Sequence, residues 1–269
     1  MTCASELAAE QQILEHAKQQ VTTKLFEYTD YCAQLGRPPP PAGVPHGANY
    51  TDKLAELEKL LSSISGEVSQ RQKLLNTEMT AIDELVSVLG ETPPGEAAFS
   101  GPSGTPHLSD IRLELMRAFK KKLLLVRNER TAEVNEIAAL CAQNMNDLVI
   151  ADEGTDSMAN AELYKECDAA LLQFAKSGSS GVLKISLHEN SIALLKERCE
   201  CLQQEKERRR EELAKSGAEI ARLWTLLRIP QEEREAFQNS FKMNLSLETL
   251  AKGRKELERL NLVRSESLG

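Results

Sequence analysis

The stretch from Ser186 to Phe237 constrains the fold more than any other part of this sequence, because it carries a long apolar seam. The seam residues recur at heptad spacing and are Ile192, Leu195, Cys199, Leu202, Leu213, Ile220, Leu223 and Leu227. Such spacing keeps one apolar face on an α-helix. Lys206, Arg209 and Ser216 interrupt the middle of the seam, and Pro230 is expected to end the helix. This helix must pack against others, because its Leu and Ile side chains would otherwise lie in water.

Composition favours long helices over a compact globule. Of the 269 residues, 28% are charged and only 4% are aromatic, a bias that at helical periodicity is typical of coiled coils. The formal net charge of -8 gives no electrostatic reason to expect a nucleic-acid partner. The N-terminus does not resemble a secretory signal, and no apolar run approaches the roughly 18 residues of a membrane span. The sequence therefore predicts a cytoplasmic protein without nucleic-acid or membrane partners.

Apolar periodicity predicts helices along most of the chain, and no segment alternates in the manner of a strand. The expected helices cover residues 4–36, 49–90, 108–150, 161–176, 186–229, 231–241 and 246–263. We expect an all-α fold without β-sheet. Its architecture is expected to be an elongated rod of long antiparallel helices, arranged as helical hairpins with coiled-coil and spectrin-like packing.

Segments rich in proline, glycine and serine divide the chain. Residues 1–92 are expected to form an N-terminal helical hairpin and dimerisation region, and residues 93–107 a flexible linker. Residues 108–264 are expected to form a helical rod segment, followed by a disordered tail at residues 265–269. The prolines at 38–41 are interpreted as a stiff spacer, with a ligand for a proline-recognition domain as the alternative.

The sequence contains no motif typical of catalysis, cofactor binding or metal binding. It lacks a P-loop, a G-x-S-x-G elbow, an H-E-x-x-H pair and a calcium loop. The cysteines are scattered without a C-x-x-C pair and are interpreted as reduced structural thiols: Cys3, Cys32, Cys141, Cys167, Cys199 and Cys201. Long helical hairpins offer few concave pockets, so we expect no enzyme activity, no catalytic residue, no cofactor and no metal.

Two threonines precede prolines: Thr105 lies in the predicted linker, and Thr92 lies immediately before it. They are minimal sites for a proline-directed kinase, and their phosphorylation is a hypothesis. The alternative is that they are ordinary loop residues, because such dipeptides are common in loops.

Three of the predicted helices end in a similar phrase, in which a leucine is followed within a turn by proline. The phrases are Leu35-Gly36-Arg37-Pro38, Leu89-Gly90-Glu91-Thr92-Pro93 and Leu227-Arg228-Ile229-Pro230. Simple helix termination explains this likeness almost as well as an internal repeat does.

The residues around the third phrase resemble one protein family. Residues 219–237 read EIARLWTLLRIPQEEREAF, and a helix containing E-L-E-R-L at 256–260 follows. This pattern resembles the antiparallel-microtubule bundlers: plant MAP65 proteins, fungal Ase1 and the animal protein regulator of cytokinesis. Tyr31-Cys32 depart from the Ile-Trp that the family usually has near the end of its first helix. The motif residues are Leu223, Trp224, Leu227, Ile229, Pro230, Glu232, Glu233 and Arg234.

The resemblance implies a non-catalytic protein that cross-links microtubules at the spindle midzone in cytokinesis or in cortical arrays. It implies a homodimer formed through the N-terminal helices, with microtubules (tubulin) and a kinesin as candidate partners. In the family, the microtubule-binding domain follows the rod, and this sequence stops at Gly269, about where that domain would begin. We therefore expect the chain to supply dimerisation and spacing on the cytoskeleton. The alternative hypothesis is a coiled-coil adaptor or tether that binds helical partners without contacting microtubules.

Overall fold

A computed structural model describes residues 3–41, 44–102, 104–150, 161–177, 183, 185–241 and 244–268. These residues form helices and turns without a strand, which confirms the all-α prediction. The helices are α1 (Cys3–Leu35), α2 (Tyr50–Leu89), the 3-10 helix η1 (Glu96–Phe99), α3 (Asp110–Asp147), α5 (Ala161–Lys176), α6 (Glu189–Leu226), α7 (Gln231–Ser240) and α8 (Leu247–Leu268). The chain divides into two compact units, Met1–Arg127 and Asn128–Gly269, and α3 begins in the first and ends in the second.

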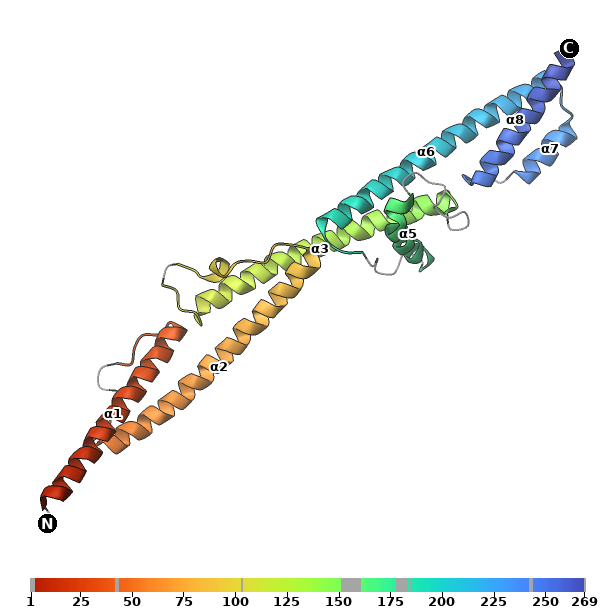
Figure 1. Ribbon diagram of the computed structural model, residues 1–269. Helices are drawn as coiled ribbons and strands as arrows, with labels where there is room; N and C mark the ends of the chain where they lie inside the picture. The colour runs from red at the N-terminus through yellow and green to blue at the C-terminus, as the bar shows by residue number, and fades with distance from the viewer. Residues whose placement is uncertain are drawn as a thin grey trace. The chain divides into compact units, whose positions relative to one another are not determined.

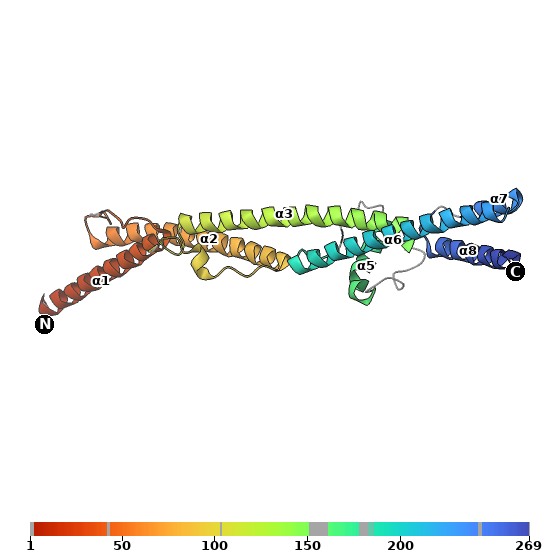
Figure 2. The same cartoon turned by 90° about the horizontal axis from the view of Figure 1, so that it is seen from above.

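In the first unit, α1 and α2 lie side by side and run in the same direction (Figure 1). Lys24 on α1 pairs with Glu58 on α2 at 3.1 Å, and Arg37, just after α1, pairs with Glu67 at 2.5 Å. Residue numbers therefore rise together along the two helices. A view turned by 90° shows the same parallel course (Figure 2).

The helices α2 and α3 are also parallel within this unit. Asp110, at the start of α3, pairs with Arg71 on α2. About two to three turns further along both helices, Glu78 accepts hydrogen bonds from Arg117 at 3.3 Å and from Lys120. The hydrogen bond from Lys120, followed by that from Arg117, lowers the pKa of the Glu78 carboxyl against the opposing effect of burial.

The expectation of antiparallel hairpins is therefore wrong for these helix pairs. A hairpin needs only a short turn, whereas a parallel pair needs a connector that runs back along the first helix. Residues 36–41 and 44–49, which include five prolines, belong to this return between α1 and α2. Proline-rich backbone is extended and stiff, which suits a segment that must cover such a distance.

Residues 93–107, expected to be a flexible linker, contain an anchored return segment. Its 3-10 helix η1 ends in Phe99, which is only 2% exposed and meets the ring of Phe119 edge-on at 5.5 Å. Further along, the Leu108 amide donates a hydrogen bond of 3.1 Å to the carbonyl of Gln34 at the end of α1. An aromatic contact and a backbone hydrogen bond thus anchor the connection from α2 to α3.

The second unit contains the larger continuous core, which is built from α3, α5 and α6. Its fully buried members include Cys141, Leu171 and Leu195, one from each helix. Along α3 and α6 the ion pairs Glu133–Lys196 and Asp147–Lys206, both 2.6 Å, again show a parallel course. The shorter α5 runs the opposite way, because its Asp168 pairs with Arg198 while its earlier Tyr164 lies beside Cys201.

The last two helices pack near the C-terminal half of α6. Arg254 on α8 donates to Glu212 on α6 at 2.6 Å, and further along both helices Trp224 donates to Glu256. The helix α8 continues to Leu268. Residues 265–268, expected to belong to a disordered tail, are therefore helical.

The three similar phrases noted in the sequence form the same backbone cap. In each, a residue just past the helix end has a positive φ, which is 72° at Gly36, 65° at Gly90 and 50° at Arg228. Each also makes the two hydrogen bonds of a Schellman motif, such as Arg228 N to Thr225 O at 3.3 Å and Ile229 N to Trp224 O at 3.0 Å. A shared cap accounts for the likeness of the phrases without an internal repeat.

Substitutions at the caps should change stability in opposite directions. Gly90→Ala should lower the free energy of unfolding by about 1 kcal/mol, because a Cβ is unfavourable at positive φ. Arg228→Gly should raise it by about 0.5 to 1 kcal/mol for the same reason. Urea unfolding followed by circular dichroism measures both, and a loss of stability in Arg228→Gly would contradict this account of the cap.

Candidate functional site at the Trp224 corner

The family-motif residues come together where α6 ends and α7 begins. Leu223 and Trp224 on α6 are buried, and so is Ile229 in the turn, whereas Leu227 is half-buried. Pro230 precedes the first residue of α7, where its missing N–H and fixed φ are compatible with a helix start. The Schellman bonds bring Ile229 back against Trp224, so the corner is closed by backbone and side chain together.

Trp224 is the centre of a small hydrophobic cluster. Its indole is 7% exposed and meets the Phe237 ring of α7 edge-on, with centroids 5.7 Å apart and planes at 80°. Leu260 of α8 is fully buried in the same cluster, together with Ile220 and Leu223 of α6. Edge-on aromatic pairs add stability beyond the area they bury. Trp224 therefore joins α6, α7 and α8.

The polar edge of the indole is satisfied by a carboxylate. Trp224 Nε1 donates to Glu256 Oε1 at 3.0 Å, and Arg259 donates to both oxygens of Glu256 at 2.8 and 2.9 Å. Burial alone would raise the pKa of Glu256, but the hydrogen bonds from Arg259 and Trp224 outweigh it and lower this pKa. The E-L-E-R-L segment of α8 is thus the polar partner of the tryptophan.

Arg234 fixes the angle at which α7 leaves the corner. Its Nε donates to the Ile229 carbonyl at 2.9 Å, and its Nη2 donates to the Trp224 carbonyl at 3.0 Å. Both carbonyls belong to the end of α6 and its cap, where intrahelical donors are missing. Of the two motif glutamates, Glu233 lies 3.6 Å from Arg259, and Glu232 is exposed in the first turn of α7.

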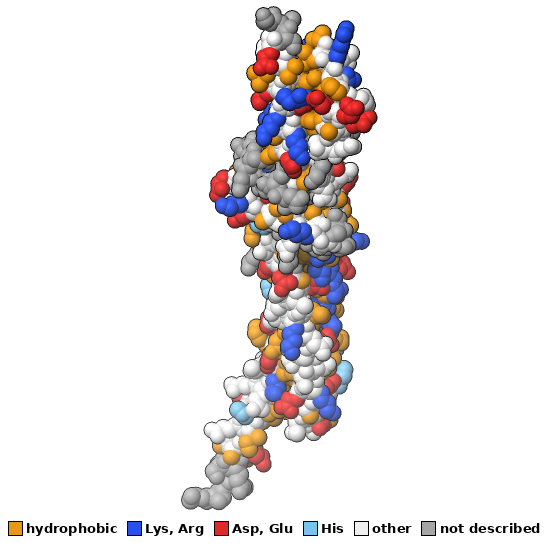
Figure 3. Space-filling view, turned by 90° about the vertical axis from the view of Figure 1, so that its right-hand side faces the viewer, with side chains coloured by type: hydrophobic (Ala, Val, Ile, Leu, Met, Phe, Trp, Pro, Cys, Tyr) orange, Lys and Arg blue, Asp and Glu red, His pale blue; other side chains and the backbone are white. Residues whose placement is uncertain are grey.

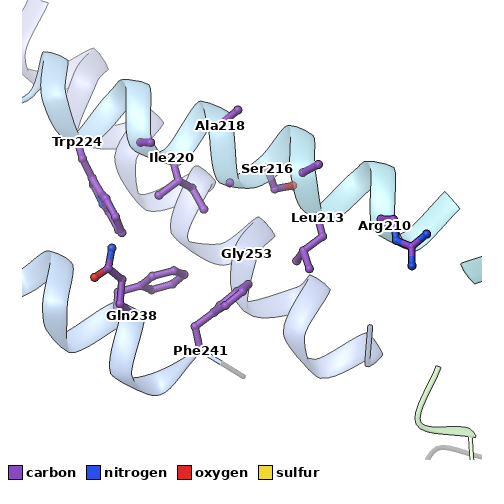
Figure 4. A pocket seen from close by; sticks show the side chains of 13 residues that line it. Arg210, Leu213, Ser216, Ala218, Ile220, Trp224, Gln238, Phe241 and Gly253 are labelled. Carbon is purple, nitrogen blue, oxygen red and sulfur yellow. The ribbon is translucent and has the colours of Figure 1, made fainter. Parts of the chain in front are cut away.

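A groove opens beside this corner between α6, α7 and α8. It has a volume of about 510 Å³ and is mainly apolar. Ile220 and Trp224 project from α6 toward Gln238 of α7 and toward Phe241, which follows α7, with Gly253 of α8 behind them (Figure 4). The groove contains no cluster of carboxylates or imidazoles, so its chemistry is that of packing.

The polar residues that interrupt the α6 seam bind other elements of the second unit. Arg209 is 1% exposed and donates to the carbonyls of Leu148 at 3.2 Å and Leu245 at 2.8 Å. Lys206 pairs with Asp147 and also donates to Asn144 at 3.2 Å. These residues join the end of α3 to the segment before α8 through α6.

A second polar connection, which the sequence analysis missed, attaches α5. Arg198 and Asp168 are both buried and form two hydrogen bonds of 2.7 Å. The guanidinium also lies 4.9 Å from the centre of the Tyr164 ring. One signal was present in the sequence: Asp168 falls on the apolar face of its helix, between Tyr164 and Leu171, where a carboxylate needs a partner.

The two threonines of the kinase hypothesis have different surroundings. Thr92 is exposed and follows the α2 cap. Thr105 is half-buried, and its hydroxyl donates to the Pro102 carbonyl at 2.6 Å.

The surface and the side-chain clusters give no indication of catalysis. Basic and acidic side chains are interspersed over most of the face shown in Figure 3. Among the residues that the structure describes, no group of three His, Cys, Asp or Glu side chains could hold a metal ion. None of the helices in the described ranges is both long and apolar enough to span a bilayer.

Truncation of Trp224 should reveal how much the corner contributes. Trp224→Ala should cost about 3 to 5 kcal/mol of unfolding free energy, because it removes a buried aromatic that three helices share. Trp224→Phe, which retains a ring but loses the bond to Glu256, should cost clearly less. Urea denaturation of both variants is the measurement, and an unchanged midpoint in Trp224→Ala would refute the packing role.

A family model described as Microtubule associated protein (MAP65/ASE1 family) matches residues 3–269 of the chain. Comparison with curated individual proteins found no match.

Proposed function

The chain belongs to the MAP65/ASE1 family of microtubule-associated proteins, and we propose that it serves as the dimerising spacer of a protein that bundles antiparallel microtubules. The family match over residues 3–269 carries this proposal, because it extends the likeness from the Trp224 corner to nearly the whole chain. A spacer needs stiffness and a defined length, and helices of 33 to 40 residues supply both. At 1.5 Å per residue, the longest of them extends over roughly 60 Å.

Dimer formation is supported by the N-terminal part of α1. Glu58 is the ninth residue of α2 and pairs with Lys24, so α2 begins beside about residue 16 of α1. The preceding part of α1 therefore has no neighbour from α2. Every side chain described from residue 7 to residue 16 is exposed.

The heptad row of α1 shows where a partner is needed. Its exposed fraction falls along the helix, from 57% at Leu7 and 45% at Leu14 to 9% at Leu35. Val21 and Tyr28, between these positions, are half-buried. The row is thus covered by neighbouring segments only in its second half. A second copy of the chain would cover Leu7 and Leu14 with the same kind of seam.

The dimer test compares two exposed leucines. Leu14→Glu should convert a dimer into a monomer at micromolar concentration, because a charge would be buried in the seam. Leu163→Glu, on α5 at 60% exposure, is the matched control and should stay dimeric. Sedimentation equilibrium measures both, and a monomeric wild-type chain would refute the dimer.

Microtubules distinguish this proposal from an adaptor that binds only helical partners. The full-length gene product should gather microtubules into bundles visible by fluorescence microscopy. Its Leu14→Glu variant should decorate single microtubules without bundling them, because bundling requires two linked copies. A dimeric product that stays in the supernatant when microtubules are pelleted would favour the adaptor.

We also propose, from the family assignment, that the protein acts at the spindle midzone in cytokinesis or in cortical microtubule arrays. We propose a kinesin as a partner. A proline-directed kinase would phosphorylate Thr92 more readily than Thr105. The Thr92 side chain is exposed, whereas the Thr105 hydroxyl already donates a short hydrogen bond.

A further inference from the structure

Two cysteines face each other across the seam between α3 and α6. Cys141 on α3 is fully buried, and Cys199 on α6 packs against the same hydrophobic core. The Cys199 side chain lies close enough to Cys141 to add to the rise that burial causes in the pKa of the Cys141 thiol. Both positions are seam positions, and facing seam residues of parallel helices lie side by side.

The surrounding ion pairs hold this level of the two helices in register. Glu133–Lys196 lies on one side of the cysteines along the helices, and Asp147–Lys206 lies on the other, each at 2.6 Å. Sliding of α6 along α3 would break both pairs. The sulfur atoms therefore remain neighbours in the folded second unit.

Access to the pair is one-sided. Cys199 is half-buried and lines a groove of about 490 Å³ between α3 and α6, together with Leu140, Gln143 and Gln203. Cys141 is closed off behind it, and burial raises the pKa of its thiol. A small oxidant would thus reach Cys199 first and leave Cys141 as the resolving thiol.

We propose that Cys141 and Cys199 form an oxidation site that a hydroperoxide closes into a disulfide linking α3 to α6. The Cys199 thiol loses its proton, and the thiolate attacks one oxygen of hydrogen peroxide. The O–O bond breaks, Cys199 becomes a sulfenic acid, and the leaving hydroxide takes up the released proton and departs as water. The Cys141 sulfur then attacks the sulfenic sulfur, the S–S bond forms, the S–O bond breaks, and a second water leaves with the thiol proton. Two thiols lose two electrons in total, and one hydrogen peroxide accepts them.

The neighbouring cysteines provide the specificity controls. Cys167 on α5 is buried near Cys141, and Cys201 lies 3.9 Å from the Tyr164 hydroxyl on the other side of α6. Cys201 is two residues from Cys199, so it points away from the seam that Cys199 occupies. Oxidation should therefore distinguish Cys199 from both of them.

The experiment treats the folded chain with hydrogen peroxide, blocks remaining thiols, and maps disulfides by mass spectrometry without reduction. The wild type, Cys167→Ser and Cys201→Ser should all yield the Cys141–Cys199 link within one chain. Cys199→Ser should lose it, with its helical circular dichroism unchanged. The oxidised wild type should also unfold at a higher urea concentration than the reduced form, a shift that Cys199→Ser should lack.

Three results would overturn the proposal. They are a sulfenic or sulfinic acid at Cys199 without a link to Cys141, a preferred link through Cys167 or Cys201, and links found only between two chains. Mixing isotopically labelled and unlabelled chain before oxidation separates links within a chain from links between chains.

Discussion

The structure depends on parallel overlap between apolar seams. A long amphipathic helix cannot bury its seam alone, and here each long helix lies beside a later one that runs in the same direction. The ion pairs Lys24–Glu58, Glu78–Arg117, Glu133–Lys196 and Glu212–Arg254 mark four such overlaps within the two units. The extended connectors and the anchored segment around Phe99 exist because a parallel neighbour requires the chain to return. The uncovered seam of α1 follows from the same rule, since α2 begins only beside about residue 16 of α1.

Polar side chains on α6 give this packing its specificity. An apolar seam alone would tolerate a shift by one heptad, whereas Arg209 finds the carbonyls of Leu148 and Leu245 in only one register. Buried ion pairs such as Arg198–Asp168 add little stability compared with apolar residues of similar size, but breaking one leaves a buried charge. The polar middle of the α6 seam therefore attaches the end of α3 and the segment before α8, and Arg198 attaches α5. The Trp224 corner ends the same helix by a different means, with an indole shared among three helices.

Much of this fold could be predicted from the sequence, and the missing parts share a physical cause. Heptad spacing, proline breaks and glycine caps placed the helices within a few residues, and the Trp-to-Pro phrase identified the family that the family model confirms. The direction of the helices could not be read, because a seam of Leu and Ile looks the same from either end and the connectors are long enough for both arrangements. The buried contacts of Arg198 and Arg209 could not be predicted, because a polar residue in or beside a seam indicates weak packing until its partner, distant in sequence, is known.

Zero-length carbodiimide cross-linking can test whether α3 and α6 run parallel. This reagent joins lysine to carboxylate only where the two already form an ion pair. If α3 and α6 run parallel, the cross-links Glu133–Lys196 and Asp147–Lys206 should both form within one chain. Both ion pairs lie at 2.6 Å, and residue numbers rise together along α3 and α6. Links between Glu133 and Lys206, or between Asp147 and Lys196, would show an antiparallel pair and contradict the account.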